Sequence, residues 1–233
     1  MRLVTRPHPT PGPDRPPTRL RPVADPPVLE VRGLRAERGG RVVVDGVDLR
    51  VDAGSVTALV GDSGSGKTSL LRCIVGLDAV AAGDVLYEGA RIGSLDPCEL
   101  RRRVALVAQS PVMLPGDVRA NLLYAQPGAD APAALASVGL DTALLEREAE
   151  ELSGGERARV AIARALAHEP RVVLLDEPTA SLHAEAVAEV EGLVGSLASG
   201  GIAVVVVTHD RAQARRLADS ELRLERGRAV PAQ

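Results

Sequence analysis

A glycine-rich segment carries the residues that could bind phosphate. It follows the apolar run Val56–Val60 and reads Gly61-Asp62-Ser63-Gly64-Ser65-Gly66-Lys67-Thr68-Ser69. Its first eight residues fit the spacing G-x-x-x-x-G-K-[ST]: the glycines let successive backbone N–H groups point at a phosphate, and the helix that follows adds its positive end. Lys67 supplies a mobile charge to the phosphates and Thr68 a hydroxyl to Mg²⁺. We therefore expect all nine residues to bind a nucleotide.

The lysine in this segment is informative because of the rest of the composition. The chain has 28 basic residues, and Lys67 is the only one that is not arginine. A planar guanidinium is bulkier than an ammonium group and binds phosphate in a different geometry. The exception at this position favours a phosphate cradle over an accidental glycine-rich turn.

Polar residues follow two further apolar runs, where they could act on the bound phosphates. Asp176 and Glu177 come directly after Val172–Leu175, and Thr208-His209 follows Ile202–Val207. Ligands bind at the carboxyl edge of open α/β sheets, so we expect these side chains to face the glycine-rich segment. Asp176 is suited to hold Mg²⁺, and Glu177 to polarise a water for attack on the terminal phosphate. The alternatives are an exposed acidic turn before Pro178 and a purely structural histidine.

The string Leu152-Ser153-Gly154-Gly155-Glu156 indicates the class of nucleotide-binding protein. A helix capped by Ser153 would explain the residue types, but not the complete string. From about Val28 to Arg228 the chain resembles the ABC ATPases, with this string as their signature motif and with the motifs in the family's order. Gln109 is similar to the family's Q-loop glutamine.

The resemblance assigns a role to each motif. Asp176 and Glu177 match the Walker B aspartate and catalytic glutamate, and His209 matches the switch histidine. Gln109 and His209 would sense the terminal phosphate, with Gln109 joining Thr68 and Asp176 near the metal. The implied cofactors are ATP and Mg²⁺.

The resemblance also implies partners. Two such domains pack head to tail in this family, so that Ser153, Gly154 and Gly155 complete the ATP site of the other domain. The dimer would form with a second copy or with another ABC ATPase, and its closure would act on transmembrane transporter subunits through the region of Gln109. That places the chain in the cytoplasm, peripheral on the inner face of the cell membrane.

Two positions depart from the family pattern. The loop at 35–40 lacks the usual aromatic residue near Arg38, whose guanidinium could stack on adenine instead. We expect weaker selectivity for adenine there, so that GTP competes better than usual. His183 stands where the family has an aspartate that helps the two sites communicate, which puts coupling between sites in doubt.

Composition bounds the remaining possibilities. The chain has 233 residues and a net charge of −3, which gives no global reason to expect binding to nucleic acid. Cys73 and Cys98 lack metal-ligand spacing, and no apolar run approaches the roughly 20 residues of a membrane span. Residues 1–27 hold nine of the 17 prolines and are expected to be a disordered tail.

The pattern of apolar runs predicts an α/β fold of the P-loop NTPase type. Buried strands separated by a helix favour a mostly parallel core sheet. The runs Val28–Leu34 and Val42–Val51 predict strands of an N-terminal antiparallel β subdomain, and 111–168 predicts an inserted helical subdomain. The nucleotide-binding domain as a whole is expected to span 28–233.

Three functions fit these observations. The leading one is the ATP-hydrolysing subunit of a membrane transporter; the second is a soluble ABC ATPase acting in translation or DNA repair. That second class typically carries two fused cassettes, coiled-coil inserts or zinc-binding cysteines, which this sequence lacks. A third is a domain that binds ATP but turns over slowly. The stretch 109–122 is similar to exporter cassettes and leans weakly towards export.

Overall fold

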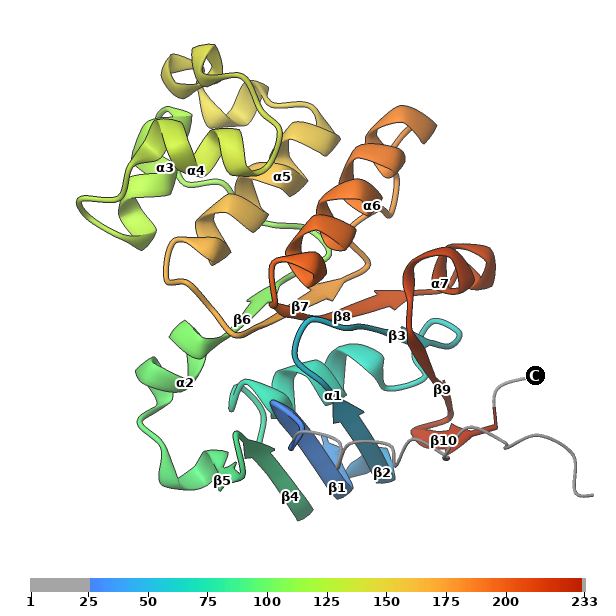
Figure 1. Ribbon diagram of the computed structural model, residues 1–233. Helices are drawn as coiled ribbons and strands as arrows, with labels where there is room; N and C mark the ends of the chain where they lie inside the picture. The colour runs from blue at the N-terminus through green and yellow to red at the C-terminus, as the bar shows by residue number, and fades with distance from the viewer. Residues whose placement is uncertain (1–25, 232–233) are drawn as a thin grey trace, which may run out of the picture.

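The structure is a computed structural model that describes residues 26–231. Its largest element is a six-stranded sheet in the order β10-β9-β3-β8-β7-β6 (Figure 1). The five strands from β9 to β6 are parallel, and β10 pairs antiparallel with β9 at the edge. The strands are β3 (Val56–Val60), β6 (Val104–Val107), β7 (Val172–Asp176), β8 (Ala203–Thr208), β9 (Ser220–Glu225) and β10 (Arg228–Val230). The carboxyl ends of β3, β7 and β8 therefore share one edge of the sheet.

A second sheet is antiparallel, in the order β2-β1-β4-β5. Its strands are β1 (Leu29–Arg38), β2 (Arg41–Val51), β4 (Ala82–Tyr87) and β5 (Ala90–Arg91). Gly39 and Gly40 join β1 to β2 with φ angles of 57° and 73°, and left-handed residues of this kind make the tight turn that suits twisted strands. The short helix η1 (Ile92–Ser94) follows β5.

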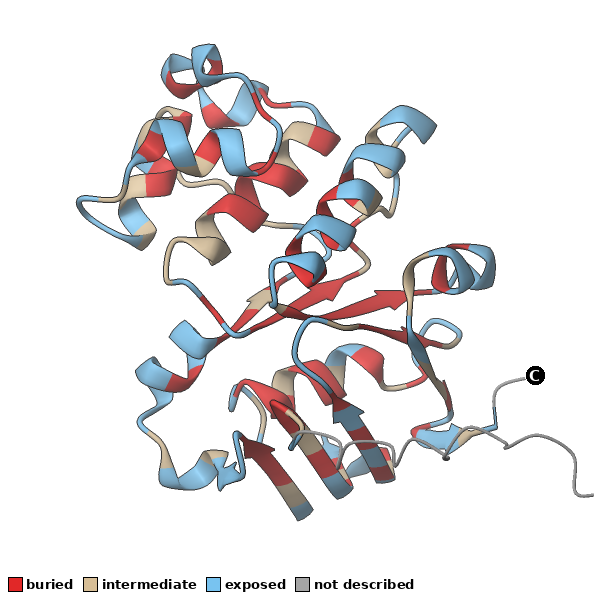
Figure 2. Cartoon of the chain, in the orientation of Figure 1, coloured by how far each residue is buried: buried red, intermediate tan, exposed pale blue. Residues whose placement is uncertain are grey.

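Helix α1 (Lys67–Ile74) lies between the two sheets (Figure 1). Leu70, Leu71 and Ile74 are fully buried in one cluster with residues of both sheets. Successive residues of β7 face opposite sides: Val172 and Leu174 join this cluster, and the next residues face the helices on the far side. Every residue of β3, β7 and β8 is buried, which explains why these strands read as continuous apolar runs (Figure 2).

The chain between β6 and β7 is helical. It contains α3 (Val118–Ala125), α4 (Ala131–Ser137), η2 (Thr142–Glu146), η3 (Ala149–Glu151) and α5 (Gly154–Leu166). Aspartates at 117, 130 and 141 begin three of these elements by accepting a backbone N–H. Val118, Leu122 and Ile162 belong to the same core cluster as Val173 of β7, so this region is packed onto the sheet through α5.

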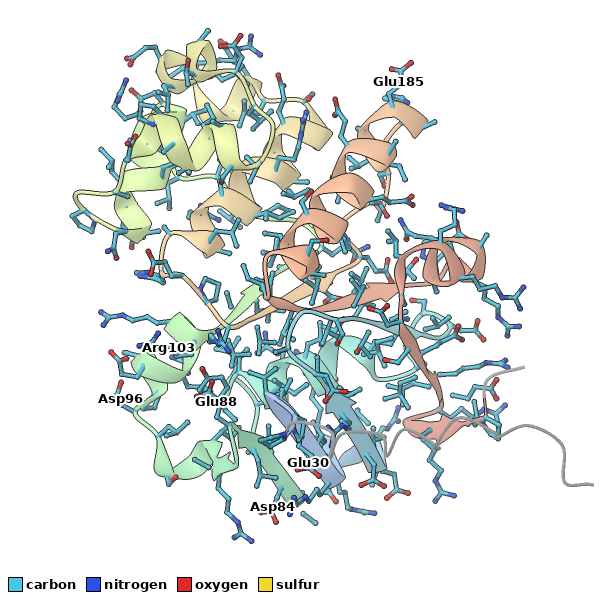
Figure 3. The ribbon with its side chains drawn as sticks, in the orientation of Figure 1. Glu30, Asp84, Glu88, Asp96, Arg103 and Glu185 are labelled. Carbon is cyan, nitrogen blue, oxygen red and sulfur yellow. The ribbon has the colours of Figure 1, made fainter. Side chains whose placement is uncertain are left out.

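The remaining helices connect the strands. They are α2 (Pro97–Arg103), α6 (Ala184–Ser199) and α7 (Arg211–Leu217). Asp96 and Arg103, labelled in Figure 3, mark the two ends of α2: Asp96 caps its first turn and Arg103 lies in its last, as the helix dipole favours.

The predicted fold class is confirmed, since both sheets and the helices between β6 and β7 are present. The structure adds β5, α7, β9 and β10, which the sequence did not predict. Within the predicted helical subdomain at 111–168, Thr142–Glu146 is a 3₁₀ helix and not an α-helix. The expected disorder concerns residues 1–27, of which 1–25 lie outside the described residues.

Candidate nucleotide-binding site

The phosphate loop joins β3 to α1 and depends on glycine at two close approaches. Gly66 precedes α1 with φ at 107°, and a Cβ there would lie 2.4 Å from the carbonyl oxygen of Val43. A Cβ on Gly61 would lie 2.3 Å from the carbonyl oxygen of Leu224. Both positions therefore exclude a side chain, which keeps the loop backbone close to β2 and β9.

Lys67 is held over this loop. Its side chain is 5% exposed, and Nζ donates to the carbonyl oxygens of Gly61 at 2.7 Å and Asp62 at 2.9 Å. Ser65 is buried too, and its Oγ has no hydrogen-bond partner within the described part of the chain. A buried donor without a partner is costly, so its place in this loop fits a ligand that accepts hydrogen bonds.

Asp176 ends β7 beside the first turn of α1. Its Oδ2 accepts a 2.8 Å hydrogen bond from the hydroxyl of Thr68, and the residue is 7% exposed. Burial raises the pKa of Asp176, and the neighbouring charge of Glu177 raises it further; the hydrogen bond from Thr68 and the charge of Lys67 oppose the shift. Because burial disfavours the charged form of the Asp176 carboxylate, a cation bound beside it would stabilise that form.

The paired oxygens of Thr68 and Asp176 fit Mg²⁺. This ion prefers oxygen ligands and is usually held by one or two carboxylates together with substrate phosphates. Residues 26–231 contain no cluster of three or more His, Cys, Asp or Glu that could hold a metal by itself. Thr68 and Asp176 offer two oxygens, and phosphate or water would supply the other ligands of such an ion.

The carboxylate of Glu177 lies close to three other predicted residues, Gln109, His209 and Lys67. Gln109 Nε2 donates to its Oε2 at 3.1 Å, and His209 Nδ1 lies 3.7 Å from the same oxygen. Lys67 Nζ lies 3.9 Å from the other oxygen, Oε1. The backbone of Glu177 is left-handed, with φ at 48°, and its N–H donates to the carbonyl of Val207 on β8. Strained backbone of this kind often marks a functional position.

The signature segment begins α5, away from Glu177 along the chain. Ser153 Oγ accepts from the N–H of Glu156, whose carboxylate accepts from the N–H of Ser153. That backbone hydrogen bond is the main cause of a lowered pKa at Glu156. Ser153 and Gly154 are exposed, while Gly155 is buried, with room for no Cβ because Ala186 would lie 2.8 Å away. The predicted residues thus form two groups, one at the sheet edge and one at this helix end.

The two positions that depart from the family pattern, Arg38 and His183, lie on other elements than the phosphate loop and α5. Arg38 is exposed at the end of β1, and its charge adds to that of Arg72 in lowering the pKa of Asp78. His183 is the exposed residue before α6, and its side chain makes no capping hydrogen bond. Glu185, labelled in Figure 3, marks the first turn of this helix, beside the start of α5.

Sequence reasoning missed a buried amide next to the site. Gln213 of α7 is 4% exposed and donates to Thr179, two residues after Glu177, at 2.9 Å. Helix α7 was not predicted, so nothing in the sequence indicated that a single glutamine among its arginines would be buried.

The comparisons with known proteins agree with this geometry. A family model described as "ABC transporter" matches residues 44–180, which is more than half of the chain. The chain belongs to the ABC transporter family. It is 39% identical over 214 residues to "Protein STAR1" of Oryza sativa subsp. japonica, covering 88% of this chain and 62% of that protein.

Bacterial members of the ABC family are equally similar. "Fe(3+) ions import ATP-binding protein FbpC 1" of Rhodococcus jostii (strain RHA1) is 40% identical, covering 86% of this chain and 60% of its own length. "Tungstate uptake system ATP-binding protein TupC" of Peptoclostridium acidaminophilum is 37% identical, covering 86% and 95%. The chain spans about 60% of the length of STAR1 and of FbpC 1, and nearly the whole length of TupC.

Solved ABC structures share the fold. CbiO1 from Clostridium perfringens, part of the ABC transporter complex cbiONQ, superposes with a TM-score of 0.81 at 26% identity and covers 89% of this chain and 88% of that one. A bacterial Atm1-family ABC exporter with ATP bound gives 0.78 at 26% identity, covering 90% and 39%. Within residues 26–231, no helix is both long and apolar enough to span a membrane.

Proposed function

We propose that the chain binds and hydrolyses ATP as a subunit of a membrane transporter. The carrying observation is the convergence on Glu177, whose carboxylate lies within 4 Å of Gln109, Lys67 and His209. Fold alone would not support this function, but a phosphate loop beside a buried carboxylate and a polarising glutamate does.

The phosphate loop is proposed to bind the phosphates of ATP. Residues Gly61 to Ser69 would offer N–H groups and the Lys67 ammonium to the phosphates of ATP, with the positive end of α1 behind them. Thr68 and Asp176, already 2.8 Å apart, would hold Mg²⁺ together with those phosphates. The metal would neutralise charge on the phosphates. Gln109, exposed at the same site, is proposed to contact it as well.

Glu177 is proposed as the group that orients and polarises the attacking water. Its position depends on β8, which accepts its N–H at Val207, and on a turn closed by Ala180 N–H to the Glu177 carbonyl. Gln109 and His209 both face Oε2, so either can respond to what Glu177 binds. Because Glu177 and His209 are both present, slow turnover by a defective site is disfavoured.

The active form is proposed to be a head-to-tail dimer of two copies of this chain. Ser153 and Gly154 are exposed at the start of α5, where the Ser153 hydroxyl accepts from the N–H of Glu156 in its own helix turn. The positive end of α5 and the Ser153 hydroxyl are suited to a phosphate from outside. Each chain carries both halves of a site, so two copies can complete two sites without a different ATPase.

A groove near Gln109 is proposed to receive the transmembrane partner. It has a volume of about 640 Å³ and lies between the sheet and the helical region. Val112 and Tyr124 on its rim are each 73% exposed, which is unusual for large apolar residues and typical of an interface. Arg101 and Arg164 also line it and donate to backbone carbonyls, so an apolar segment carrying a carboxylate is the partner that fits.

The direction proposed is import. FbpC 1 and TupC, among the relatives above, are named for import and uptake, which outweighs the weak similarity of 109–122 to exporters. A transport subunit of this kind would work on the cytoplasmic face of the membrane. The soluble class acting in translation or DNA repair gains no support from these relatives.

The test of this function uses Glu177→Gln. It is expected to lower kcat for ATP hydrolysis by about 100- to 10,000-fold while ATP still binds, because the amide fills the same space but cannot polarise water as a carboxylate does. The measurements are steady-state phosphate release and equilibrium binding of labelled ATP, with the exposed Gln126→Leu as matched control. Turnover equal to that of the unaltered chain would contradict the role of Glu177.

The transporter role is tested with the same variant. Affinity purification of Glu177→Gln from detergent-solubilised native membranes, with ATP and Mg²⁺, is expected to recover a multi-span membrane protein. Recovery of ribosomal or DNA-repair proteins instead would favour the soluble class.

The proposal for Arg38 is tested by nucleotide competition. We expect GTP to displace labelled ATP at concentrations within about tenfold of ATP itself, since a guanidinium stacks on either purine. A strong preference for ATP would contradict it.

A further inference from the structure

The loops that carry Glu177 and His209 are joined beneath the site by one buried amide. Gln213 Nε2 donates to Thr179 Oγ1 at 2.9 Å and to Glu191 Oε1 at 3.1 Å, and Thr179 Oγ1 lies 3.3 Å from the other amide atom, Oε1. The carboxylate of Glu191 fixes the orientation of the amide, because a carboxylate accepts from an N–H₂ group and repels a carbonyl oxygen. Gln213 is therefore a defined link between three elements.

The link reaches the Glu177 loop through Thr179. Thr179 lies in the turn that the Ala180 N–H closes onto the carbonyl of Glu177. The backbone of Glu177 is left-handed, a conformation that costs energy for any residue except glycine and persists only where the surroundings impose it. A hydrogen bond to Thr179 is one of the contacts that can impose it.

The link reaches His209 through the start of α7. Asp210 accepts from the N–H groups of Ala212 and Gln213, and its own N–H donates to the hydroxyl of Thr208. His209 thus lies between Thr208 and Asp210, which are hydrogen-bonded to each other, and Asp210 also accepts from the first turn of α7. On the opposite side Glu191 of α6 is anchored by Arg216, whose Nη2 donates to the same oxygen at 2.8 Å.

The two loops also line a cavity of about 170 Å³, through Glu177, Thr179, Ser181, His209, Asp210 and Gln213. A polar cavity of this size admits water, so packing alone does not hold the loops at a fixed separation. Gln213 lines this cavity and links the two loops by hydrogen bonds, while Glu177 Oε2 and His209 Nδ1 lie 3.7 Å apart on its wall.

We propose that Gln213 is a positioning residue for ATP hydrolysis, which keeps Glu177 and His209 in register through Thr179 and Glu191. The proposal rests on the proposed ATPase function and adds a residue to it. Displacement of a catalytic group by about 1 Å can cost on the order of 100-fold in rate without changing how substrate binds. Gln213 touches neither nucleotide nor metal in this scheme.

The test compares Gln213→Leu with unaltered protein. The leucine fills a similar volume but cannot link Thr179 to Glu191, so we expect kcat to fall by about 10- to 100-fold and KM for ATP to stay within about twofold. Thr179→Val is expected to give a similar loss, and the double variant no more than the larger single loss, because both remove one link. Gln126→Leu is the matched control, at an exposed position.

A second variant separates positioning from mere stability. Gln213→Glu keeps the shape but sets a second carboxylate against Glu191, with Arg216, Glu177, Asp210 and His209 as the other charged or titratable groups nearby. Two close carboxylates favour sharing one proton, which can replace the lost donor. The kcat of this variant relative to unaltered protein is expected to rise as pH is lowered from 8 to 6, whereas a general folding defect would not show this recovery.

A readout that needs no turnover completes the test. The ring signal of His209 in ¹H–¹³C spectra, assigned by its loss in His209→Gln, is expected to shift in Gln213→Leu and to stay in place in Gln126→Leu. A Gln213→Leu variant with kcat within twofold of normal and an unmoved His209 signal overturns the proposal. If the unaltered chain shows no Glu177-dependent hydrolysis, the proposed function fails instead, and the His209 signal still decides whether Gln213 couples the loops.

Discussion

The two polar regions of this molecule differ in how far the chain completes them by itself. At the edge formed by β3, β7 and β8, Lys67, Thr68 and Asp176 all have partners within the chain. The Glu177 carboxylate there lies within 4 Å of Gln109, His209 and Lys67. At the start of α5, Ser153 is exposed and satisfies only its own helix turn. The polar groups at the sheet edge are thus already paired within one chain, whereas those at the start of α5 face outward. Two binding regions of one domain can therefore differ in how much of the site a single chain provides.

The largest expected effect comes from a substitution at the start of α5 that leaves the sheet edge unaltered. Ser153→Asp keeps a residue that caps helices as well as serine does, but places a negative charge where we propose the partner's phosphate to lie. Hydrolysis is expected to fall by about 100-fold or more, the scale of losing one donor to a developing negative charge. The free energy of unfolding is expected to change by less than about 0.5 kcal/mol.

The matched control for this change is Ser153→Ala, which loses the cap and about 1 kcal/mol of stability but adds no charge. Phosphate release and denaturant unfolding measure the two effects. Equal activity in Ser153→Asp and unaltered protein would show that no phosphate approaches this helix end.

At the organised edge, the requirements of function and of stability oppose one another. The folded-state pKa of Asp176 is raised above its unfolded value, so the fold loses stability as pH rises from the unfolded towards the folded pKa. Asp176→Asn removes that buried charge while an amide oxygen can still accept from Thr68. We expect a gain of about 0.5–2 kcal/mol at pH 7, together with loss of Mg²⁺-dependent hydrolysis.

Urea unfolding at pH 7 and pH 4 checks this prediction. The gain should shrink at the lower pH, because a raised pKa means that the folded aspartate takes up a proton more readily than the unfolded one. A loss of stability at pH 7 would show that the charge of Asp176 is already well compensated.

The smallest effect concerns the departure at α6. His183 precedes this helix without a capping bond, whereas an aspartate accepts from the first-turn N–H groups and suits the positive helix end. His183→Asp is expected to stabilise the fold by about 1 kcal/mol, which thermal unfolding would detect. His183→Ala, which also lacks a cap, should leave stability nearly unchanged, and a destabilised His183→Asp protein would contradict the role given to the cap.

Sequence predicted best where one physical signal dominates. The apolar run Val56–Val60 has the bounds of β3, and the runs Val172–Leu175 and Ile202–Val207 lie within one residue of β7 and β8, because a buried parallel strand is an apolar run. Strand β9 was missed because it has only two leucines among polar residues, and α7 because arginines fill most of its surface.

The candidate site shows the same division. Lys67 was predicted from the spacing of a continuous motif, and Glu177 from its place directly after an apolar run. The contact of Gln109 with Glu177 joins residues 68 positions apart, and the link from Gln213 to Thr179 joins residues 34 apart. Such pairings depend on how the strands and helices are arranged, which local sequence does not express.

The measurement that tests the division into two regions most directly is the mass of the Glu177→Gln protein in solution, by light scattering with and without ATP and Mg²⁺. If each chain carries two halves of a site, ATP should convert monomers into dimers, and adding Ser153→Asp to the same chain should prevent it. Monomers under both conditions, or dimers that form regardless of ATP and of position 153, would contradict the shared site.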